Sequence, residues 1–283
     1  MTRPPALSAT RTKEYLQCPL KFRYSVVDGI PQPPTVATVK GNVVHKALED
    51  LFSVPPSSRT LATAQGMLPE VWRSTLQRSK ETADLFSDSS TLAAAQADTE
   101  QLLENYFRME RPENLHPRGR EQFVDARLDS GILLRGIIDR IDEAPDGALR
   151  VVDYKTGRAP SPRFLEEALF QMRFYALLLR QAWRLPRRMQ LLYLRASDVL
   201  TLDPHDRDIA EFEGRIEGIW DRIERDATRA DFVPRTSRLC DWCAYQASCP
   251  AFGGTVTPPS EEGLARLLEI RQKSAGASPS LGT

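Results

Sequence analysis

The chain has 283 residues, of which 41% are hydrophobic and 27% charged, and its formal net charge is zero. This composition is that of a globular protein, and the length suits one large domain with additions. No apolar run approaches the roughly 20 residues that cross a bilayer, and residues 1–8 lack the apolar core of a signal peptide. We therefore expect a cytoplasmic protein with no membrane partner. Zero net charge neither indicates nor excludes nucleic acid, because a local basic patch decides that.

The N-terminal part of the chain is predicted to be helical. Residues 1–7 are expected to be disordered, and Ser8 can cap a helix over Ala9–Gln17, which Cys18-Pro19 interrupts. The segment 28–35 is rich in proline and predicts a loop. The spacing of apolar residues then predicts three helices, over 41–52, 61–79 and 91–110.

After residue 119 the pattern changes to that of a sheet. Gly131 and the Asp146-Gly147 pair separate three apolar segments, which is typical of an antiparallel meander. The three strands are expected at Gln122–Leu128, Ile132–Ile141 and Leu149–Tyr154. They are followed by a long helix (Pro162–Arg184), two strands (Met189–Leu194 and Val199–Leu202) and an amphipathic helix (Asp206–Thr228). This order predicts an α/β or α+β sheet domain with a helical N-terminal insertion.

The third predicted strand runs into the sequence Asp153-Tyr154-Lys155-Thr156-Gly157. Because side chains alternate between the faces of a strand, Asp153 and Lys155 point the same way and Tyr154 the other way. A carboxylate beside an ammonium near a strand end suits a metal site with an adjacent cation. An isolated pair of this kind is more often a surface ion pair of little energetic value. Its interpretation therefore depends on the rest of the chain.

Four other polar features have both a structural and a functional interpretation. Asp139 follows the apolar run of the second strand, and His45 lies beside the apolar face of its helix. Gln171 and Tyr175 are four residues apart and so share a helix face. The segment 180–195 contains five arginines and no acidic residue, so it is either a phosphate-binding patch or a solvated helix end. The candidate DNA contacts in that segment are Arg184, Arg187 and Arg188.

The four cysteines suggest a metal site. Cys240, Cys243 and Cys249 are spaced C-x2-C-x5-C, and Cys18 lies far upstream. In a cytosolic protein such a group is more typical of a metal or redox site than of disulfides. Four thiolates fit tetrahedral zinc or an iron–sulfur cluster. Structural zinc sites usually consist of two paired knuckles, so this one-plus-three arrangement favours a 4Fe–4S cluster, which would clip the first helix to the C-terminal segment.

Together these motifs resemble the RecB-family branch of the PD-(D/E)XK nucleases. The chain looks similar to the iron–sulfur members, which include the C-terminal nuclease of AddB, CRISPR-associated RecB-like exonucleases and exonuclease V-type enzymes. The matching elements are G-x-x-x-H (Gly41 to His45), G-x-x-D-R (Gly136 to Arg140), D-x-K-T-G (Asp153 to Gly157), Q-x-x-x-Y (Gln171 to Tyr175) and the four cysteines. Each motif is weak alone, but all of them occur in the family's order across residues 8–250. No helicase motor accompanies them, so a stand-alone nuclease or a subunit is expected.

The resemblance implies a restriction-endonuclease-like core, in which a mixed sheet is flanked by helices. It implies one nuclease domain over residues 8–252. The tail over 253–283 is rich in Pro, Ser and Gly and is expected to be mostly disordered, with a candidate short helix near Glu261–Gln272. Within the domain it implies a helical region at 41–119, a catalytic sheet core at 120–204 and an iron–sulfur segment at 232–250 that Cys18 closes.

The resemblance also implies roles for the site residues. Asp139 and Asp153 would be carboxylates that bridge Mg²⁺ or Mn²⁺, and His45 and the backbone carbonyl of Tyr154 would be further ligands. Lys155 would orient or deprotonate the attacking water and stabilise charge on the phosphoryl group. Gln171 and Tyr175 would hold the lysine or the DNA backbone. The cluster ligands would be Cys18, Cys240, Cys243 and Cys249, with Zn²⁺ as the alternative metal.

The expected function is that of a metal-dependent DNA exonuclease acting on single-stranded or end-bearing DNA. DNA repair, recombination or CRISPR-related processing would be its setting, and a helicase or repair protein a candidate partner. The alternative is a non-catalytic DNA-binding or scaffold subunit, against which the intact Asp139, Asp153 and Lys155 argue. A redox protein is a third hypothesis, but it would not need the D-x-K and Q-x-x-x-Y motifs.

Overall fold

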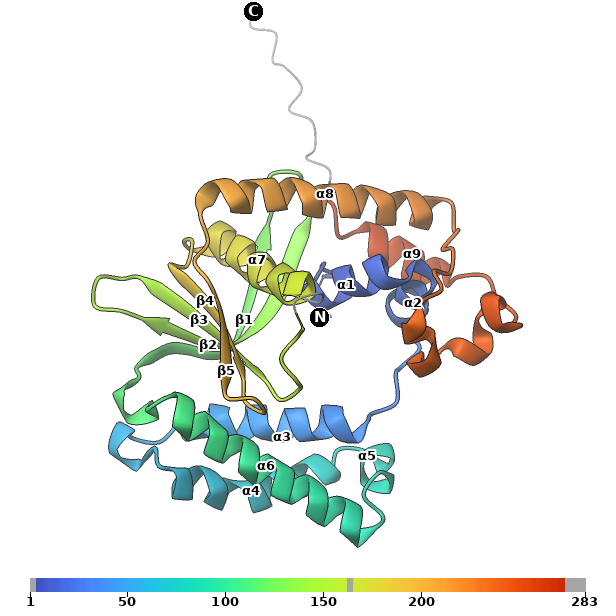
Figure 1. The fold of residues 1–283 in the computed structure, drawn as a ribbon. Coiled ribbons are helices and arrows are strands. Elements are labelled where there is room, and N and C mark those ends of the chain that lie inside the picture. The colour runs from blue at the N-terminus through green and yellow to red at the C-terminus, as the bar shows by residue number, and fades with distance from the viewer. Residues whose placement is uncertain (1–3, 162–164, 273–283) are drawn as a thin grey trace, which may run out of the picture.

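The computed structural model describes residues 4–161 and 165–272. Its centre is a mixed five-stranded sheet with the strand order β1-β2-β3-β4-β5 and helices on both faces (Figure 1). The strands are β1 (Pro117–Arg127), β2 (Leu133–Glu143), β3 (Leu149–Lys155), β4 (Arg188–Tyr193) and β5 (Asp198–Leu202). Neighbouring strands are antiparallel except β3 and β4, which are parallel. The predicted mixed sheet flanked by helices is confirmed, as is its antiparallel meander.

The connections between the strands follow from turn chemistry. Gly147 adopts a φ of 81° in the turn between β2 and β3, and Gly131 adopts 85° in the turn before β2. Such positive φ values favour glycine. The parallel pair β3–β4 cannot be closed by a hairpin. The chain instead crosses one face of the sheet through helix α7 (Leu165–Ala182) and then returns.

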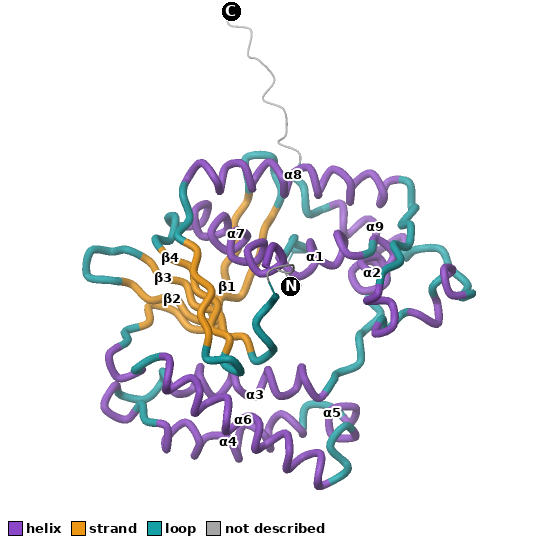
Figure 2. The backbone as a smooth tube through the Cα atoms, in the orientation of Figure 1, coloured by secondary structure: helices purple, strands orange, loops and turns teal. Residues whose placement is uncertain are grey.

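Two hydrophobic cores lie on opposite faces of the sheet. The tube view shows helices on both sides of the strands (Figure 2). Val151 belongs to the core shared with α7, whereas Val152 and Tyr154 belong to the core shared with helix α3 (Val36–Leu51). This division follows from the alternation of side chains along β3. It places Asp153, two residues after Val151, on the α7 side.

The remaining helices cover the two faces. The first face is covered by α1 (Ala9–Gln17), α2 (Pro19–Phe22) with a π-helical turn (Arg23–Val27), α8 (Asp206–Thr228) and α9 (Glu261–Leu268). The second face is covered by α3 with α4 (Leu61–Leu76), α5 (Lys80–Asp84) and α6 (Ser89–Met109). Helix α3 begins five residues before the predicted start at Gly41, because Thr35 and Thr38 form a capping box. No helix in the described ranges is both long and apolar enough to cross a membrane.

Parts of the two ends for which disorder is expected make defined backbone contacts, and a helix, α9, forms at the place near Glu261 where the sequence predicts one. Leu7 is buried, its N–H donates to the carbonyl of Leu133 (2.9 Å), and its carbonyl accepts from the N–H of Arg135 (2.8 Å). The N–H of Leu133 donates to the carbonyl of Ile270, just after α9 (3.0 Å). The reason is that β3 pairs only with the last four residues of β2. The start of β2 therefore needs other backbone partners. Residues 1–3 and 273–283 of the predicted disordered ends lie outside the described residues.

Candidate active site

Asp153 and Lys155 meet Gln171 at the end of β3. The side chain of Asp153 is almost fully buried; its Oδ2 forms an ion pair with the Lys155 ammonium, and its Oδ1 accepts from Nε2 of Gln171 (2.8 Å). Lys155 Nζ donates to Oε1 of the same amide (3.1 Å). Gln171 reaches both groups because α7 covers the face toward which Asp153 and Lys155 point. One amide thus fixes the carboxylate and the ammonium in a common orientation.

Tyr175 lies one helical turn beyond Gln171 and packs on β2. A Cβ atom at Gly136 would lie 2.8 Å from the Tyr175 ring, so only glycine allows this approach. Burial raises the pKa of Tyr175, and the charges of Asp153 and Asp139 raise it further. The phenol is therefore neutral at physiological pH and can donate a hydrogen bond.

The backbone of Tyr154 connects Asp139 with His45. The N–H of Tyr154 donates to Oδ2 of Asp139 (2.7 Å), and its carbonyl oxygen lies 3.0 Å from Nε2 of His45. The other ring nitrogen of His45 lies 3.4 Å from Oδ2 of Asp139. Helix α3 carries His45, so this site forms where α3 meets the ends of β2 and β3.

Glu121 is a member of this group that the sequence did not reveal. In the β1–β2 pairing Arg120 is opposite Arg140 and Gln122 is opposite Ile138, so Glu121 and Asp139 lie between the same two pairs. Its Oε1 lies 3.8 Å from Nδ1 of His45. Like charges close together on two neighbouring strands are destabilising. Glu121 also has a φ of 42°, which is uncommon for a non-glycine residue and occurs often at functional sites.

The group has an excess of negative charge that a cation would relieve. Burial raises the pKa of Asp153 to about 6, and the charge of Asp139 acts in the same direction. Burial alone would lower the pKa of His45, but Asp139 and Glu121 outweigh it and raise that pKa to about 10. Within the described ranges, His45, Glu121 and Asp139 form the metal-ligand group whose ligand atoms all lie within 4.8 Å of one another. Carboxylate oxygens with one imidazole suit Mg²⁺ or Mn²⁺.

A buried arginine supports the site from behind. Arg140 follows Asp139, is fully buried, and donates to both carboxylate oxygens of Glu110, just after α6 (2.8 Å each). It also donates to the hydroxyl of Tyr154 (2.6 Å) and lies over its ring. Arg140 thereby fixes the helical region on the strands that hold Asp139 and Tyr154.

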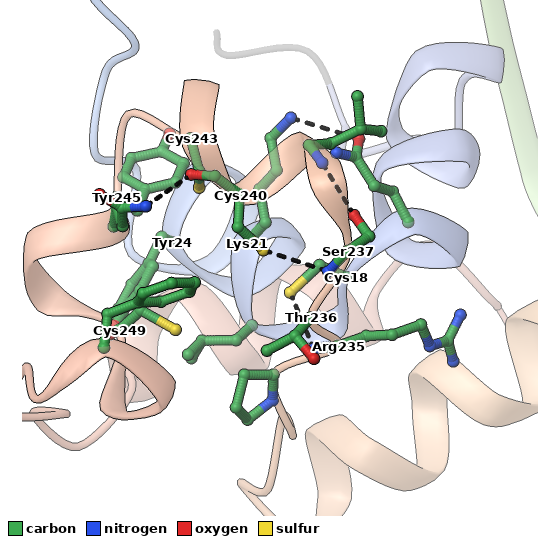
Figure 3. A pocket seen from close by; sticks show the side chains of 16 residues that line it. Cys18, Lys21, Tyr24, Arg235, Thr236, Ser237, Cys240, Cys243, Tyr245 and Cys249 are labelled. Carbon is green, nitrogen blue, oxygen red and sulfur yellow. Dashed lines mark hydrogen bonds between the residues drawn. The ribbon is translucent and has the colours of Figure 1, made fainter.

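The four cysteines come together at a second place, around one pocket (Figure 3). Cys18 lies between α1 and α2, while the other three lie in the short 3₁₀ turns that follow α8. Two sulfurs accept backbone hydrogen bonds of 3.4 Å, Cys18 from Arg235 and Cys240 from Ser237. The pocket is closed on one side by Leu20, Tyr24 and Tyr245. Two long-range bonds hold it together, from Tyr24 to the carbonyl of Ser248 (2.9 Å) and from Tyr245 to that of Ile30 (2.8 Å).

The candidate DNA-binding arginines lie away from both sites. Arg188 begins β4 and is paired in register with Arg150, whereas Lys155 is paired with Tyr193 at the other end of the strand, roughly 16 Å away. Each of the three arginines has a carboxylate partner: Glu143 for Arg184, Asp146 for Arg187 and Asp203 for Arg188. This placement favours the solvated-surface interpretation, and DNA binding by these arginines stays a prediction.

Comparison with known proteins identifies one family. A model described as the PD-(D/E)XK nuclease superfamily matches residues 6–250. No curated protein matches the sequence. A solved structure titled "Crystal structure of SSO0001" is 16% identical, with a TM-score of 0.42 over 89% of this chain and 88% of its own. A likeness at that level supports no further conclusion.

Proposed function

Because the chain belongs to the PD-(D/E)XK nuclease superfamily, we propose that it is a RecB-like DNA exonuclease that hydrolyses single-stranded ends. Membership implies a metal-dependent nuclease with DNA as its substrate. The observation that best supports catalysis by this chain is the contact of Asp153 and Lys155 with one amide, that of Gln171, at the edge where Asp139 and His45 meet.

The donor set fits a divalent cation. Asp139, Asp153, His45 and the Tyr154 carbonyl would hold Mg²⁺ or Mn²⁺, and Glu121 would add a carboxylate on the α3 side. Such an ion supplies a water activated toward attack and neutralises the leaving oxygen. The closeness of the Glu121 and Asp139 carboxylates, which both approach Nδ1 of His45, supports this assignment, because a bound cation would turn their repulsion into attraction.

The side chains around the donors have separate tasks. Lys155 would orient the attacking water through its Nζ, or take a proton there, and would stabilise charge on the phosphoryl oxygens. Gln171 holds Lys155 and Asp153 together, so the ammonium stays beside the carboxylate. The Tyr154 N–H fixes the Asp139 carboxylate. Tyr175 lies in reach of Gln171 and would position it or a DNA phosphate.

We assign a 4Fe–4S cluster to Cys18, Cys240, Cys243 and Cys249. The four side chains come from separate turns and line one pocket, which supports a single inorganic group held by all of them. The arrangement of one cysteine far upstream and three close together favours the cluster over a zinc site made of paired knuckles. The two N–H···S hydrogen bonds also suit cluster thiolates, and Zn²⁺ is the alternative.

The setting that this activity suits is DNA repair, recombination or CRISPR-related processing. An exonuclease that acts on single strands needs another activity to expose them, so a helicase or repair protein is the candidate partner. The competing assignment is a DNA-binding scaffold with a structural clip, which would bind DNA without cutting it.

The test is a nuclease assay on end-labelled single strands, with the protein purified anaerobically. We expect shortening of the strand with Mg²⁺ or Mn²⁺ and none in chelator. Binding without cleavage under all metal conditions would favour the scaffold, and cleavage that persists in chelator would contradict the metal assignment.

Glu121→Gln should lower the affinity for the divalent metal ion while the chain stays folded. The amide keeps the size of the carboxylate but loses one negative charge beside His45 and Asp139, so we expect the Mn²⁺ affinity measured by calorimetry to fall about tenfold. Raised Mn²⁺ should restore much of the cleavage rate. Glu49→Gln is the matched control, because this α3 carboxylate lines one open cleft along α3 together with His45 and Glu121 but pairs with Lys46. Equal Mn²⁺ affinity in the Glu121→Gln and wild-type proteins would remove Glu121 from the site.

A further inference from the structure

Two open clefts adjoin the Lys155 end of the sheet, one on each side. The first, of about 730 Å³, lies along α3 and is lined by His45, Glu121 and Thr156. The second, of about 620 Å³, lies between α1 and the start of α7 and is lined by Lys13 and Glu167. Figure 1 shows α1 with α7 on one side of this end of the sheet and α3 on the other. The first cleft contains two residues of the candidate active site, His45 and Glu121, and the second contains Phe170, which precedes Gln171 on α7.

Lys13 is a cation without a partner in the α1 cleft. It forms no hydrogen bond or salt bridge with any described residue. Two carboxylates of this cleft are already paired with other cations, since Glu14 contacts Lys21 and Glu166 contacts Arg173. Burial lowers the pKa of Lys13, and the charge of Lys155 lowers it further, while Asp153 and Glu167 act against them. Lys13 is therefore close enough to Asp153 and Lys155 for their charges to act on its ammonium group.

Arg78 is the corresponding cation in the α3 cleft. It follows α4 in the helical insertion, its side chain is exposed, and it lines the same cleft as His45 and Glu121. Within the described ranges its guanidinium has no hydrogen bond or salt bridge. The other cation in this cleft, Lys46, is held by Glu49 and Asp50. Arg78 is thus free to bind an anion that enters along α3.

We infer that a single DNA strand crosses the Lys155 edge, with Lys13 contacting its backbone on the α1 side and Arg78 on the α3 side. The two residues would bind phosphates on opposite sides of the scissile one. Arginine and lysine both bind phosphate, and neither contact needs a particular base. The path joins the helical insertion to the helix that precedes Cys18. This inference rests on the proposed nuclease function and extends it to residues outside the shared motifs.

The test is binding of a fluorescent single-stranded 20-mer, with Ca²⁺ in place of Mg²⁺ and intact DNA verified on a gel. For single strands log K falls with log salt by about 0.7 per phosphate contact. Lys13→Ala and Arg78→Ala should each reduce the slope by about 0.7 and weaken binding about fivefold at 0.1 M salt. In the double variant the slope of log K against log salt should fall by about 1.4. Lys13→Arg and Arg78→Lys keep the positive charges and should keep most of the wild-type slope.

Two charge-matched controls are available in the helical insertion. Lys80→Ala and Arg73→Ala each remove an exposed cation that is paired on its own helix, with Asp84 and Glu70 respectively. Both should leave the slope unchanged. If Lys13→Ala and Arg78→Ala also leave it unchanged while the wild type binds and cuts DNA, the path is wrong and the nuclease function stands. If the wild-type protein neither binds nor cuts DNA, the strand path and the nuclease function are both wrong. An equal loss of slope on a blunt duplex would overturn the single-strand assignment.

Discussion

Replacing Lys155 with alanine should abolish cleavage of end-labelled single-stranded DNA while the protein stays folded. The variant removes the only ammonium that contacts Asp153 among the described residues. Loss of a group that handles the proton and stabilises phosphoryl charge costs about 10²–10⁴ in rate. Initial rates at saturating Mn²⁺ measure the loss, and circular dichroism verifies the fold.

The substitution at Asp153 should keep the size of the side chain, because this residue is buried and hydrogen-bonded. The side chain is 4% exposed and accepts from Gln171, so alanine would leave a small cavity and an unpaired amide. Asp153→Asn keeps the volume and removes the charge, and we expect the same loss of cleavage from it. Lys80→Ala, which removes an exposed lysine on α5, should cut at the wild-type rate. Full activity in Lys155→Ala or Asp153→Asn would disprove the assignment of the site.

Replacing Cys18 with alanine should have the largest effect on stability. In the proposed cluster, Cys18 would join the N-terminal helices to a segment more than two hundred residues later, and structural metal sites contribute on the order of 10 kcal/mol. We expect anaerobically purified wild-type protein to contain iron near four per chain, and Cys18→Ala to lose that iron and melt at least 10 °C lower. Cleavage should fall only as folding fails, because a site with four cysteine ligands has no open position for a water.

Proteolysis and metal analysis complete this test. Without its tether the variant should be nicked near residues 28–35 and 230–240, which flank the pocket. Asp153→Asn should keep both its iron and its melting temperature. Stoichiometric zinc and no iron in wild-type protein made with iron supplied would contradict the cluster, although the tether itself would survive with a different metal. Unchanged stability in Cys18→Ala would contradict the tether.

The sequence by itself determined the local elements and the composition of the candidate site. The Ser8 cap and the Cys18-Pro19 interruption placed α1 at Ala9–Gln17. Apolar periodicity placed α8 at Asp206–Thr228, because a helix face repeats within a few residues. Alternation along β3 put Asp153 and Lys155 on one side and Tyr154 on the other. The spacing of Gln171 and Tyr175 likewise needed only helix geometry. Each of these predictions depends only on residues close together in the sequence, within a helix or a strand.

Only the tertiary structure decided which distant groups meet. Glu121 comes close to Asp139 because the register of β1 and β2 is set by the turn at 128–132, and a shift of one residue would place it on the other face. The arginines of segment 184–188 looked like a free basic patch, yet carboxylates from the β2–β3 turn and from the segment after β5 neutralise them. Leu7 and Ile270 are held in place because the start of β2 has no strand on its β3 side, although β1 pairs along its other side. Arg140 is buried because its charge is paired with Glu110, which comes from the end of α6. Hydrogen bonds and ion pairs between residues far apart in sequence depend on the arrangement of all the elements in the fold. A local sequence pattern does not contain that information.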